Sequence, residues 1–464
     1  MVLKVRAKSN PVVIPRRRGL YHLLHPQRLM APHPKAQSLS DLRIELSGIF
    51  TAVRRMTTIE ISSKQSSATG FVRLGLSRFL LNRILRDCRL HISCTVTGTE
   101  LAAGRGPQRL GIRVADPEVL WRIVTDLDPG AGELFMDGKW EMTEGDLGAF
   151  ATMMARNYQR LLSGPLRPLW TLTLRKDLGD HGWDPEASRR NVRRHYDIGD
   201  DLYELMLDEG MVYSCAFFDT PQMSLREAQV NKLRISIHRL GIGPGMRVLD
   251  IGCGWGEACR VIAAETGAAT VHGITLAENQ FKTAVERSSH IGHPPEYFLA
   301  DYREHAAQHR GDYDRILSIG MFEHVGVANY RAYFAAVRDQ LTRDGKALIH
   351  TIMNAANPAG GTINSVWLQR YIFPGGRIPD LVEILDAAAH EGLTPDCPPY
   401  LQPPSDYAES LRRWRSNFCR NLDRLDSRRY DACFRRMWLF YLAMCEAMFD
   451  GCGFQAGQVV FRKR

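Results

Sequence analysis

The sequence predicts an α/β protein: a doubly wound sheet with a lid-like insertion, preceded by a smaller mixed domain and a basic, irregular tail. Three observations predict this class. Strand and helix patterns alternate from residue 247 to residue 352, a glycine-rich turn joins the first of these strands to its helix, and the charge and proline content change near residue 72. Right-handed crossovers between parallel strands place helices on both faces of such a sheet. Ligands then bind outside the carboxyl ends of the strands.

The chain of 464 residues is long enough for two or three domains. We expect residues 1–72 to be the basic tail and residues 166–464 the doubly wound domain. Residues 73–165 are expected to be the small domain, which is a second candidate, beside the tail, for contact with the membrane or lipid. The insertion spans about residues 355–425, is rich in Gly, Pro and aromatic residues, and is expected to cover a substrate site.

The tail carries most of the charge. Its first 60 residues hold eleven Lys or Arg and three acids, which is +8 of the formal net charge of +9. A basic tail favours anionic surfaces such as phospholipid headgroups; a solvated tail without a partner and an organelle-targeting segment are the alternatives. The rest of the chain is nearly neutral, so we expect no nucleic-acid partner.

Composition also indicates the cellular compartment and the kind of membrane contact to expect. No apolar run reaches the ~18 residues of a transmembrane segment, so contact with a membrane would be peripheral. The ten cysteines include no Cys-x-x-Cys pair and no Cys/His cluster with zinc spacing. Reduced thiols in a cytoplasm fit this pattern, and no metal site is expected.

Elements can be assigned in chain order. In the small domain, Pro117 to Leu127 is expected to be a helix and residues 132–138 a turn. Ser224 and Glu227 have the spacing of a capping box at the start of a helix. The alternating elements that follow are strands at 247–251, 269–274, 296–300, 313–319 and 346–352, and helices at 257–265, 277–289 and 329–341. A helix at 428–449 and a strand at 458–462 are expected to end the chain.

The stretch Val248-Leu-Asp-Ile-Gly-Cys-Gly-Trp-Gly256 is a buried strand that runs into three alternating glycines. Glycines let a backbone approach a ligand, and the free N–H groups of the following helix point at it. The spacing differs from the Gly-x-Gly-x-x-Gly of dinucleotide sites. It resembles motif I of class I S-adenosylmethionine-dependent methyltransferases; a plain tight turn is the alternative.

Further segments fall at the same edge of the predicted sheet. They are His195 to Tyr203, Met211 to Phe218, Thr275 to Gln280, Asp301-Tyr302, Gly320 to Gly326 and His350 to Ile352. In this order, over about residues 75–462, they resemble the cyclopropane-fatty-acyl-phospholipid synthase family and its mycolic-acid relatives. Tyr-Ser-Cys-Ala-Phe-Phe218 and Met-Phe-Glu-His-Val-Gly326 are the most specific matches.

The resemblance implies a reaction and its catalytic residues. The methyl of S-adenosylmethionine is added to a cis double bond of a phospholipid acyl chain, and a bound bicarbonate ion removes a proton as a cyclopropane ring closes. The residues that match the family's catalytic site are Cys215, Glu323, His350, Ile352, Tyr407 and Cys445. Tyr407 is matched only through its local sequence, and ordinary packing is the alternative for Cys445. The aromatic residues Tyr213, Phe217, Phe218 and Tyr371 are expected to face the developing positive charge.

The resemblance also implies a cofactor site. Its residues are Tyr213, Ser214, Asp250, Gly252, Cys253, Gly254, Trp255, Gly256, Thr275, Leu276, Gln280 and Tyr302. Tyr302 is expected to flank the adenine. Glu257 departs from the family, which usually has glycine there.

The resemblance places the enzyme in the cytoplasm, peripherally bound to the inner face of the membrane. Two alternatives remain open: a relative that makes a methyl-branched or methylene product, and a non-catalytic lipid-binding relative. The oligomeric state is open as well, with a homodimer as one candidate.

Overall fold

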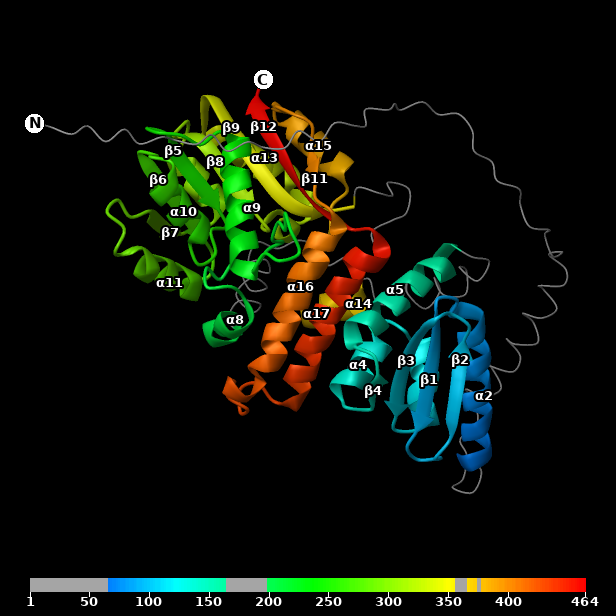
Figure 1. Ribbon diagram of the computed structural model, residues 1–464. Coiled ribbons are helices and arrows are strands. Elements are labelled where there is room, and N and C mark those ends of the chain that lie inside the picture. The colour runs from blue at the N-terminus through cyan, green and yellow to red at the C-terminus, as the bar shows by residue number, and fades with distance from the viewer. Residues whose placement is uncertain (1–65, 164–197, 355–364, 374–376) are drawn as a thin grey trace, which may run out of the picture. The chain divides into compact units, whose positions relative to one another are not determined.

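The computed structural model describes residues 66–163, 198–354, 365–373 and 377–464 (Figure 1). Helix α2 (Ser66–Ile84) begins inside the range predicted as tail. The remainder of that tail, and the first part of the predicted large domain up to residue 197, lie outside the described residues. Within the described ranges, no helix combines the length and the apolar character that a membrane crossing requires.

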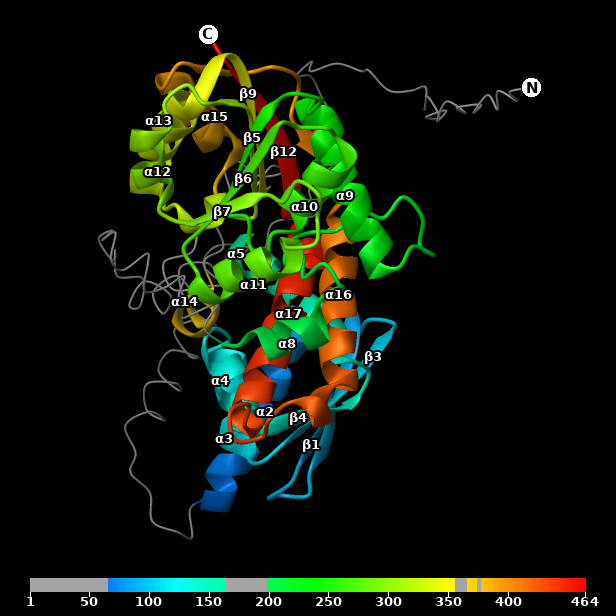
Figure 2. The ribbon, with the colours of Figure 1, turned by 90° about the vertical axis from the view of Figure 1, so that its left-hand side faces the viewer.

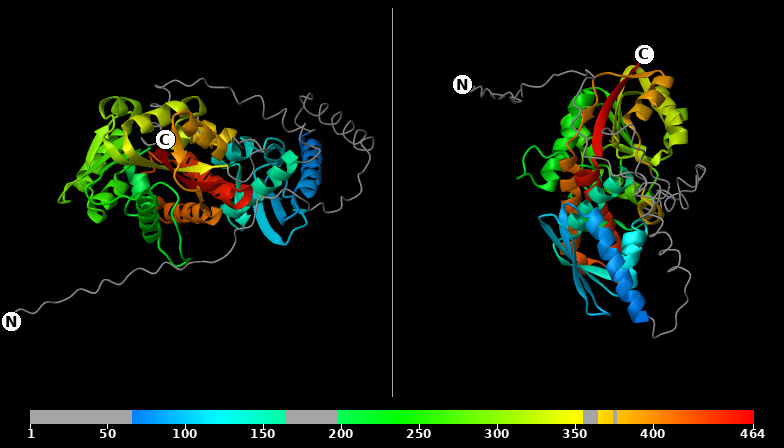
Figure 3. Two further views of the ribbon diagram at one scale, coloured as in Figure 1. Left: turned by 90° about the horizontal axis from the view of Figure 1, so that it is seen from above. Right: turned by 90° about the vertical axis from the view of Figure 1, so that its right-hand side faces the viewer.

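The small domain is a four-stranded sheet in the order β2-β1-β3-β4, with α2 against β2 (Figure 3). Its strands are β1 (Cys88–Cys94), β2 (Glu100–Gly104), β3 (Gln108–Val114) and β4 (Trp140–Glu144), and its other helices are α3 (Pro117–Thr125), α4 (Gly130–Met136) and α5 (Leu147–Ser163). Asp116 caps α3 by accepting hydrogen bonds from two backbone N–H groups, so this predicted helix is confirmed.

The turn predicted at residues 132–138 is wrong, because α4 occupies most of it. Gly132 is buried inside this helix, and a Cβ there would lie 2.5 Å from the Trp367 ring. The glycine is therefore used for close packing and not to break the helix.

The large domain has the doubly wound sheet that the sequence predicts. Its strand order is β10-β12-β9-β8-β5-β6-β7, and β11 also pairs with β12. Strands β5 to β9 are mutually parallel where they pair, whereas β12 is antiparallel to β9. The bounds are β5 (Arg247–Ile251), β6 (Thr270–Thr275), β7 (Glu296–Leu299), β8 (Tyr313–Ile319), β9 (Leu341–Met353), β10 (Leu393–Pro395), β11 (Tyr400–Leu401) and β12 (Gln455–Lys463). The chain winds outward from β5 in both directions, so the topological switch point lies between β5 and β8.

Helices cover both faces of this sheet (Figure 2). On one face, α9 (Leu225–Leu240) and α10 (Glu257–Glu265) share a buried apolar cluster with β5 and β6. On the other face, α12 (Tyr302–Gln308), α13 (Tyr330–Gln340) and α15 (Leu381–His390) share a second cluster. The predicted capping box at the start of α9 is confirmed, with Ser224 and Glu227 bonded reciprocally. The remaining elements before β9 are α8 (Asp200–Met206), α11 (Glu278–Ser288) and the short 3-10 helices η1 (Phe322–His324) and η2 (Val327–Asn329).

The insertion is more than a lid. It contributes β10 and β11 to the sheet, together with α14 (Val366–Tyr371), α15, α16 (Pro404–Arg420) and η3 (Leu422–Arg424). The last helix, α17 (Ala432–Cys452), starts and ends a few residues later than predicted and lies beside α16 (Figure 1). It also packs along α5, and thereby joins the small domain to the large one.

Candidate active site

The glycine loop follows β5 at the switch point. Gly252, Gly254 and Gly256 all have left-handed backbone, with φ of +82°, +55° and +83°. A Cβ on Gly252 would lie 2.9 Å from Met321, and one on Gly256 would lie 2.5 Å from the Tyr297 hydroxyl. A Cβ on Gly254 would meet nothing within 4 Å among the described residues. Gly252 and Gly256 therefore permit close packing, whereas Gly254 borders open space.

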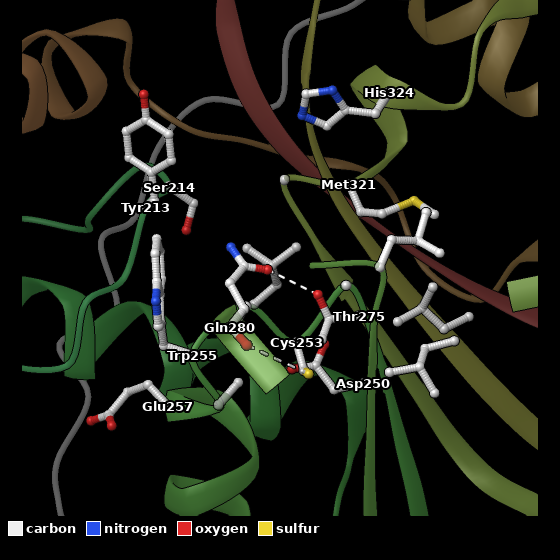
Figure 4. A pocket seen from close by; sticks show the side chains of 18 of the residues that line it. Tyr213, Ser214, Asp250, Cys253, Trp255, Glu257, Thr275, Gln280, Met321 and His324 are labelled. Atoms are coloured by element: carbon white, nitrogen blue, oxygen red, sulfur yellow. Dashed lines mark hydrogen bonds between the residues drawn. The ribbon is translucent and has the colours of Figure 1, made fainter. Parts of the chain in front are cut away.

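Gly254 lines a cavity of about 160 Å³ at the carboxyl ends of the strands (Figure 4). Every residue predicted for the cofactor except Gly256 lines it: Tyr213, Ser214, Asp250, Gly252, Cys253, Gly254, Trp255, Thr275, Leu276, Gln280 and Tyr302. We call it the cofactor cavity. The Thr275 hydroxyl donates a hydrogen bond of 2.9 Å to Gln280 Oε1. This bond orients the Gln280 side chain so that its amide nitrogen lies on the open side of the cavity.

Two buried ionisable groups, Lys232 and Asp250, line this cavity. Lys232 is fully buried in α9 and donates from Nζ to Ser214 Oγ at 2.8 Å. Burial lowers the pKa of Lys232 to about 8 and raises the pKa of Asp250 to about 7. Asp250 Oδ1 is buried with no hydrogen-bond partner in the described parts of the chain. Lys232 lines the cavity but was missed in the sequence, because a lysine on a helix normally faces solvent.

Glu257, the departure from the family, is also placed at this cavity. Its carboxylate pairs with Arg226 at 2.5 Å and with Arg260 at 2.6 Å. Arg226 in turn pairs with Asp208, which accepts bonds from the N–H groups of Gly210 and Val212. These bonds flank Met211, a non-glycine residue with φ of +55°. The ion pairs thus brace the strained segment that leads to Tyr213 and Ser214.

A second cavity of about 140 Å³ adjoins the first, and both are lined by Tyr213, Gly320 and His324. We call it the acyl cavity, after the ligand that the family resemblance implies. It contains four of the predicted catalytic residues, Glu323, Ile352, Tyr407 and Cys445. The predicted roles of these residues stay predictions, but the fold brings them to one place from η1, β9, α16 and α17.

Glu323 is the most distinctive polar group of the acyl cavity. Its Oε1 accepts a bond of 2.7 Å from the Ile352 backbone N–H. Its Oε2 is buried and has no partner among the residues that the structure describes. Burial raises the pKa of this carboxyl, which makes it a better proton acceptor once ionised. Burial also raises the pKa of Tyr407 well above its usual value, so Tyr407 remains a hydrogen-bond donor.

Cys215 and His350 are buried next to the acyl cavity and are not among the described residues that line it. The His350 ring lies edge-on to Phe217, with centroids 5.7 Å apart, and its Nδ1 is buried without a partner in the described ranges. Burial lowers the pKa of His350 to about 3, so the imidazole is neutral at physiological pH. Burial raises the pKa of Cys215 well above its usual value, so it is a thiol.

The aromatic wall differs from the prediction. Of the four residues expected, only Tyr213 lines the acyl cavity. Phe217 packs on His350, Phe218 lies under the Arg413 guanidinium, and the Tyr371 hydroxyl donates to Glu133. The wall is completed by Phe373, Tyr407, Tyr441 and Phe449. Three of these come from α16 and α17, whose approach to the sheet edge is a tertiary feature.

Comparison with known proteins is consistent with this geometry. Residues 184–459 match the family model described as mycolic acid cyclopropane synthetase. The cyclopropane-fatty-acyl-phospholipid synthase of Escherichia coli K12 is 34% identical over 355 residues, 76% of this chain and 87% of that protein. The tuberculostearic acid methyltransferase UfaA1 of Mycobacterium tuberculosis is 34% identical over 399 residues, 82% of this chain and 89% of that protein.

Solved structures agree. The cyclopropane synthase MmaA2 from Mycobacterium tuberculosis matches with a TM-score of 0.53 and 30% identity, over 62% of this chain and 100% of that one. The mycolic acid cyclopropane synthase CmaA1 complexed with SAH and CTAB gives a TM-score of 0.53 and 29% identity, over 59% of this chain and 98% of that one. This protein is therefore a member of the mycolic acid cyclopropane synthetase family.

Proposed function

We propose that this protein transfers the methyl carbon of S-adenosylmethionine to a cis double bond of a phospholipid acyl chain and closes it into a cyclopropane ring. The observation that carries the proposal is the junction of the two cavities at Tyr213, Gly320 and His324. A methyl donor held in one cavity can there reach a hydrocarbon chain held in the other. The 34% identity to the Escherichia coli synthase supports this substrate class.

The cofactor cavity suits S-adenosylmethionine. Open space at Gly254 admits the ligand close to the backbone, and the Gln280 amide is oriented to bind hydroxyl groups. Lys232 lines the cavity, donates to Ser214 and would contribute positive charge there, which would complement the carboxylate of the cofactor. When bound, the cofactor supplies an electrophilic methyl group on a sulfonium. An alkene is a weak nucleophile, so these residues contribute chiefly by holding the donor in line with it.

The acyl cavity suits a hydrocarbon that becomes positively charged during the reaction. Its wall is mainly apolar, and the aromatic rings of Tyr213, Tyr441 and Phe449 that line it would supply π electrons near that charge. Because the ring closes by loss of a proton, a proton acceptor must stand in the same cavity. Glu323 is the carboxylate among its described lining residues.

We further propose that a bicarbonate ion binds here. The donor set fits it: Tyr407 keeps its proton, and Glu323 Oε2 is a buried acceptor without a partner in the described ranges. The Ile352 N–H is not available to the ion, because it already donates to Glu323. His350 and Cys215 stand behind the cavity and would orient these groups. The ion would supply a base, and Glu323 would take up its proton.

The proposal is tested by label transfer. Purified protein is incubated with S-adenosylmethionine labelled in the methyl group and with vesicles of cis-unsaturated, trans-unsaturated or saturated phospholipid. We expect label in the cis-unsaturated lipid alone. Label in none of the lipids, or equally in all of them, would contradict the proposal.

We also propose that the enzyme binds the membrane surface peripherally through its basic N-terminal residues. Because α2 starts at Ser66, a variant without residues 1–65 keeps every described element. We expect it to sediment with anionic vesicles at least about tenfold more weakly than the full chain, since each Lys or Arg near such a surface contributes about 1 kcal/mol. Neutral vesicles are the control. Equal binding of both proteins to anionic vesicles would exclude this role.

A further inference from the structure

A third cavity, of about 60 Å³, lies where the small domain meets α17. The small domain contributes Leu127, Gly132 and Met154, and α17 contributes Phe440 and Met444. We call it the junction cavity. It is not needed for cofactor binding or for the chemistry at Glu323, and it has an apolar wall.

Helix α17 lines both the junction cavity and the acyl cavity, through two adjacent stripes of its surface. Tyr441, Cys445 and Phe449 face the acyl cavity, whereas Phe440, Met444 and Cys452 face the junction cavity, both at helical spacing. Met448 and Ser365 line both cavities. The two cavities therefore come closest at Met448 and Ser365, which we call the partition, and a methionine can change rotamer at little cost.

The chemistry of the junction cavity selects hydrocarbon. Asp128, the one acidic group among its described lining residues, is half-buried and already accepts bonds from Ser365 Oγ, the Val366 N–H and the Trp367 N–H, at 3.2, 3.0 and 2.9 Å. That carboxyl offers no donor to a phosphate headgroup. Among the described lining residues there is no Lys, Arg or His. A polar or anionic ligand would be desolvated here without compensation.

We propose that the junction cavity binds the methyl-terminal segment of the acyl chain whose double bond lies in the acyl cavity. This inference rests on the proposed function. The chain passes the partition at Met448 and Ser365, so the small domain contacts the end of the substrate. The distance from the reacting carbons to Leu127 and Gly132 then selects how many carbons follow the double bond.

The test uses full-length enzyme and two phosphatidylglycerols that differ only in the number of carbons beyond the cis double bond. Ala155, on α5, lines the junction cavity, and Ala155→Leu reduces its space. Met444→Trp does so from α17. We expect either variant to lower kcat/KM for the longer segment by about tenfold or more, and to leave the shorter one within about twofold. Ala332→Leu, on the exposed side of α13, is the control.

An equal loss for both lipids, or no loss for either in both variants, would overturn the proposal. A binding readout separates it from the proposed function. Trp367 lines the junction cavity, so a fatty acid brominated at its methyl end should quench the fluorescence of Trp367. This part of the quenching should be absent in Trp367→Phe. Quenching without product would refute only the proposed function; product without this quenching would refute only the subsite.

Discussion

Glu323→Gln is expected to lower product formation by about a hundredfold or more, the usual loss when a proton-transfer group is removed. The amide oxygen can still accept the Ile352 N–H bond that Oε1 accepts now, so the loop keeps its shape. The group lost is the buried Oε2, which has no other partner in the described structure and can hold a proton only in the wild type. Label transfer measures the rate, and calorimetry should show unchanged S-adenosylmethionine binding.

The pH dependence adds a second readout. Burial raises the pKa of Glu323, so its carboxyl is protonated, and unable to accept a proton, up to a higher pH than an exposed glutamate. The wild-type rate should therefore rise with pH as this carboxyl ionises, and the rise should be absent in Glu323→Gln. Glu296→Gln, at an exposed position on β7, is the control. Full activity in Glu323→Gln would remove this residue from the mechanism.

Gly254→Leu is expected to weaken S-adenosylmethionine binding by about a hundredfold or more, roughly 2.7 kcal/mol. The new side chain would occupy the cofactor cavity where a Cβ now meets no described atom within 4 Å. Left-handed backbone also makes any L side chain there costly, by roughly 1–2 kcal/mol of stability. Calorimetric titration measures the first effect and thermal unfolding the second.

Gly245 provides a matched control for the backbone strain that a leucine would introduce at Gly254. Gly245 also has left-handed backbone, with φ of +76°, and its Cβ would likewise meet no described atom within 4 Å. It precedes β5 and is remote from the cofactor cavity. Gly245→Leu should lose similar stability but keep its affinity for S-adenosylmethionine within about threefold. Similar affinities in the two leucine variants would show that Gly254 does not border the cofactor.

The elements that sequence predicts well are those with local causes. The capping box at Ser224 and the strand–turn–helix through Gly252 depend on residues within a few positions of one another. Gly132 shows the opposite case. Its helix could not be predicted, because the reason for a glycine there is the Trp367 ring, more than two hundred positions away.

The residues of the candidate site also fall into those that local sequence predicts and those that depend on distant contacts. Motif residues such as Glu323 and Gly254 could be predicted to lie at one edge of the sheet, because the carboxyl ends of parallel strands share that edge; they line two adjoining cavities there. Lys232 could not, since its burial depends on the Ser214 segment folding over it. The position of Met448 could not be predicted either, because a methionine in an apolar helix is usually a core residue. Only the packing of α17 places it at two cavities.

The most direct measurement is the chemical form of the carbon that is added. The chain is expressed in a host that makes unsaturated phospholipids but lacks this modification, and the extracted acyl chains are analysed by mass spectrometry and proton NMR. We expect added CH₂ together with the upfield ring protons of a cyclopropane. A mass gain with methyl-branch or methylene signals and no ring protons would contradict this expectation, and so would unmodified lipid from cells that contain folded protein.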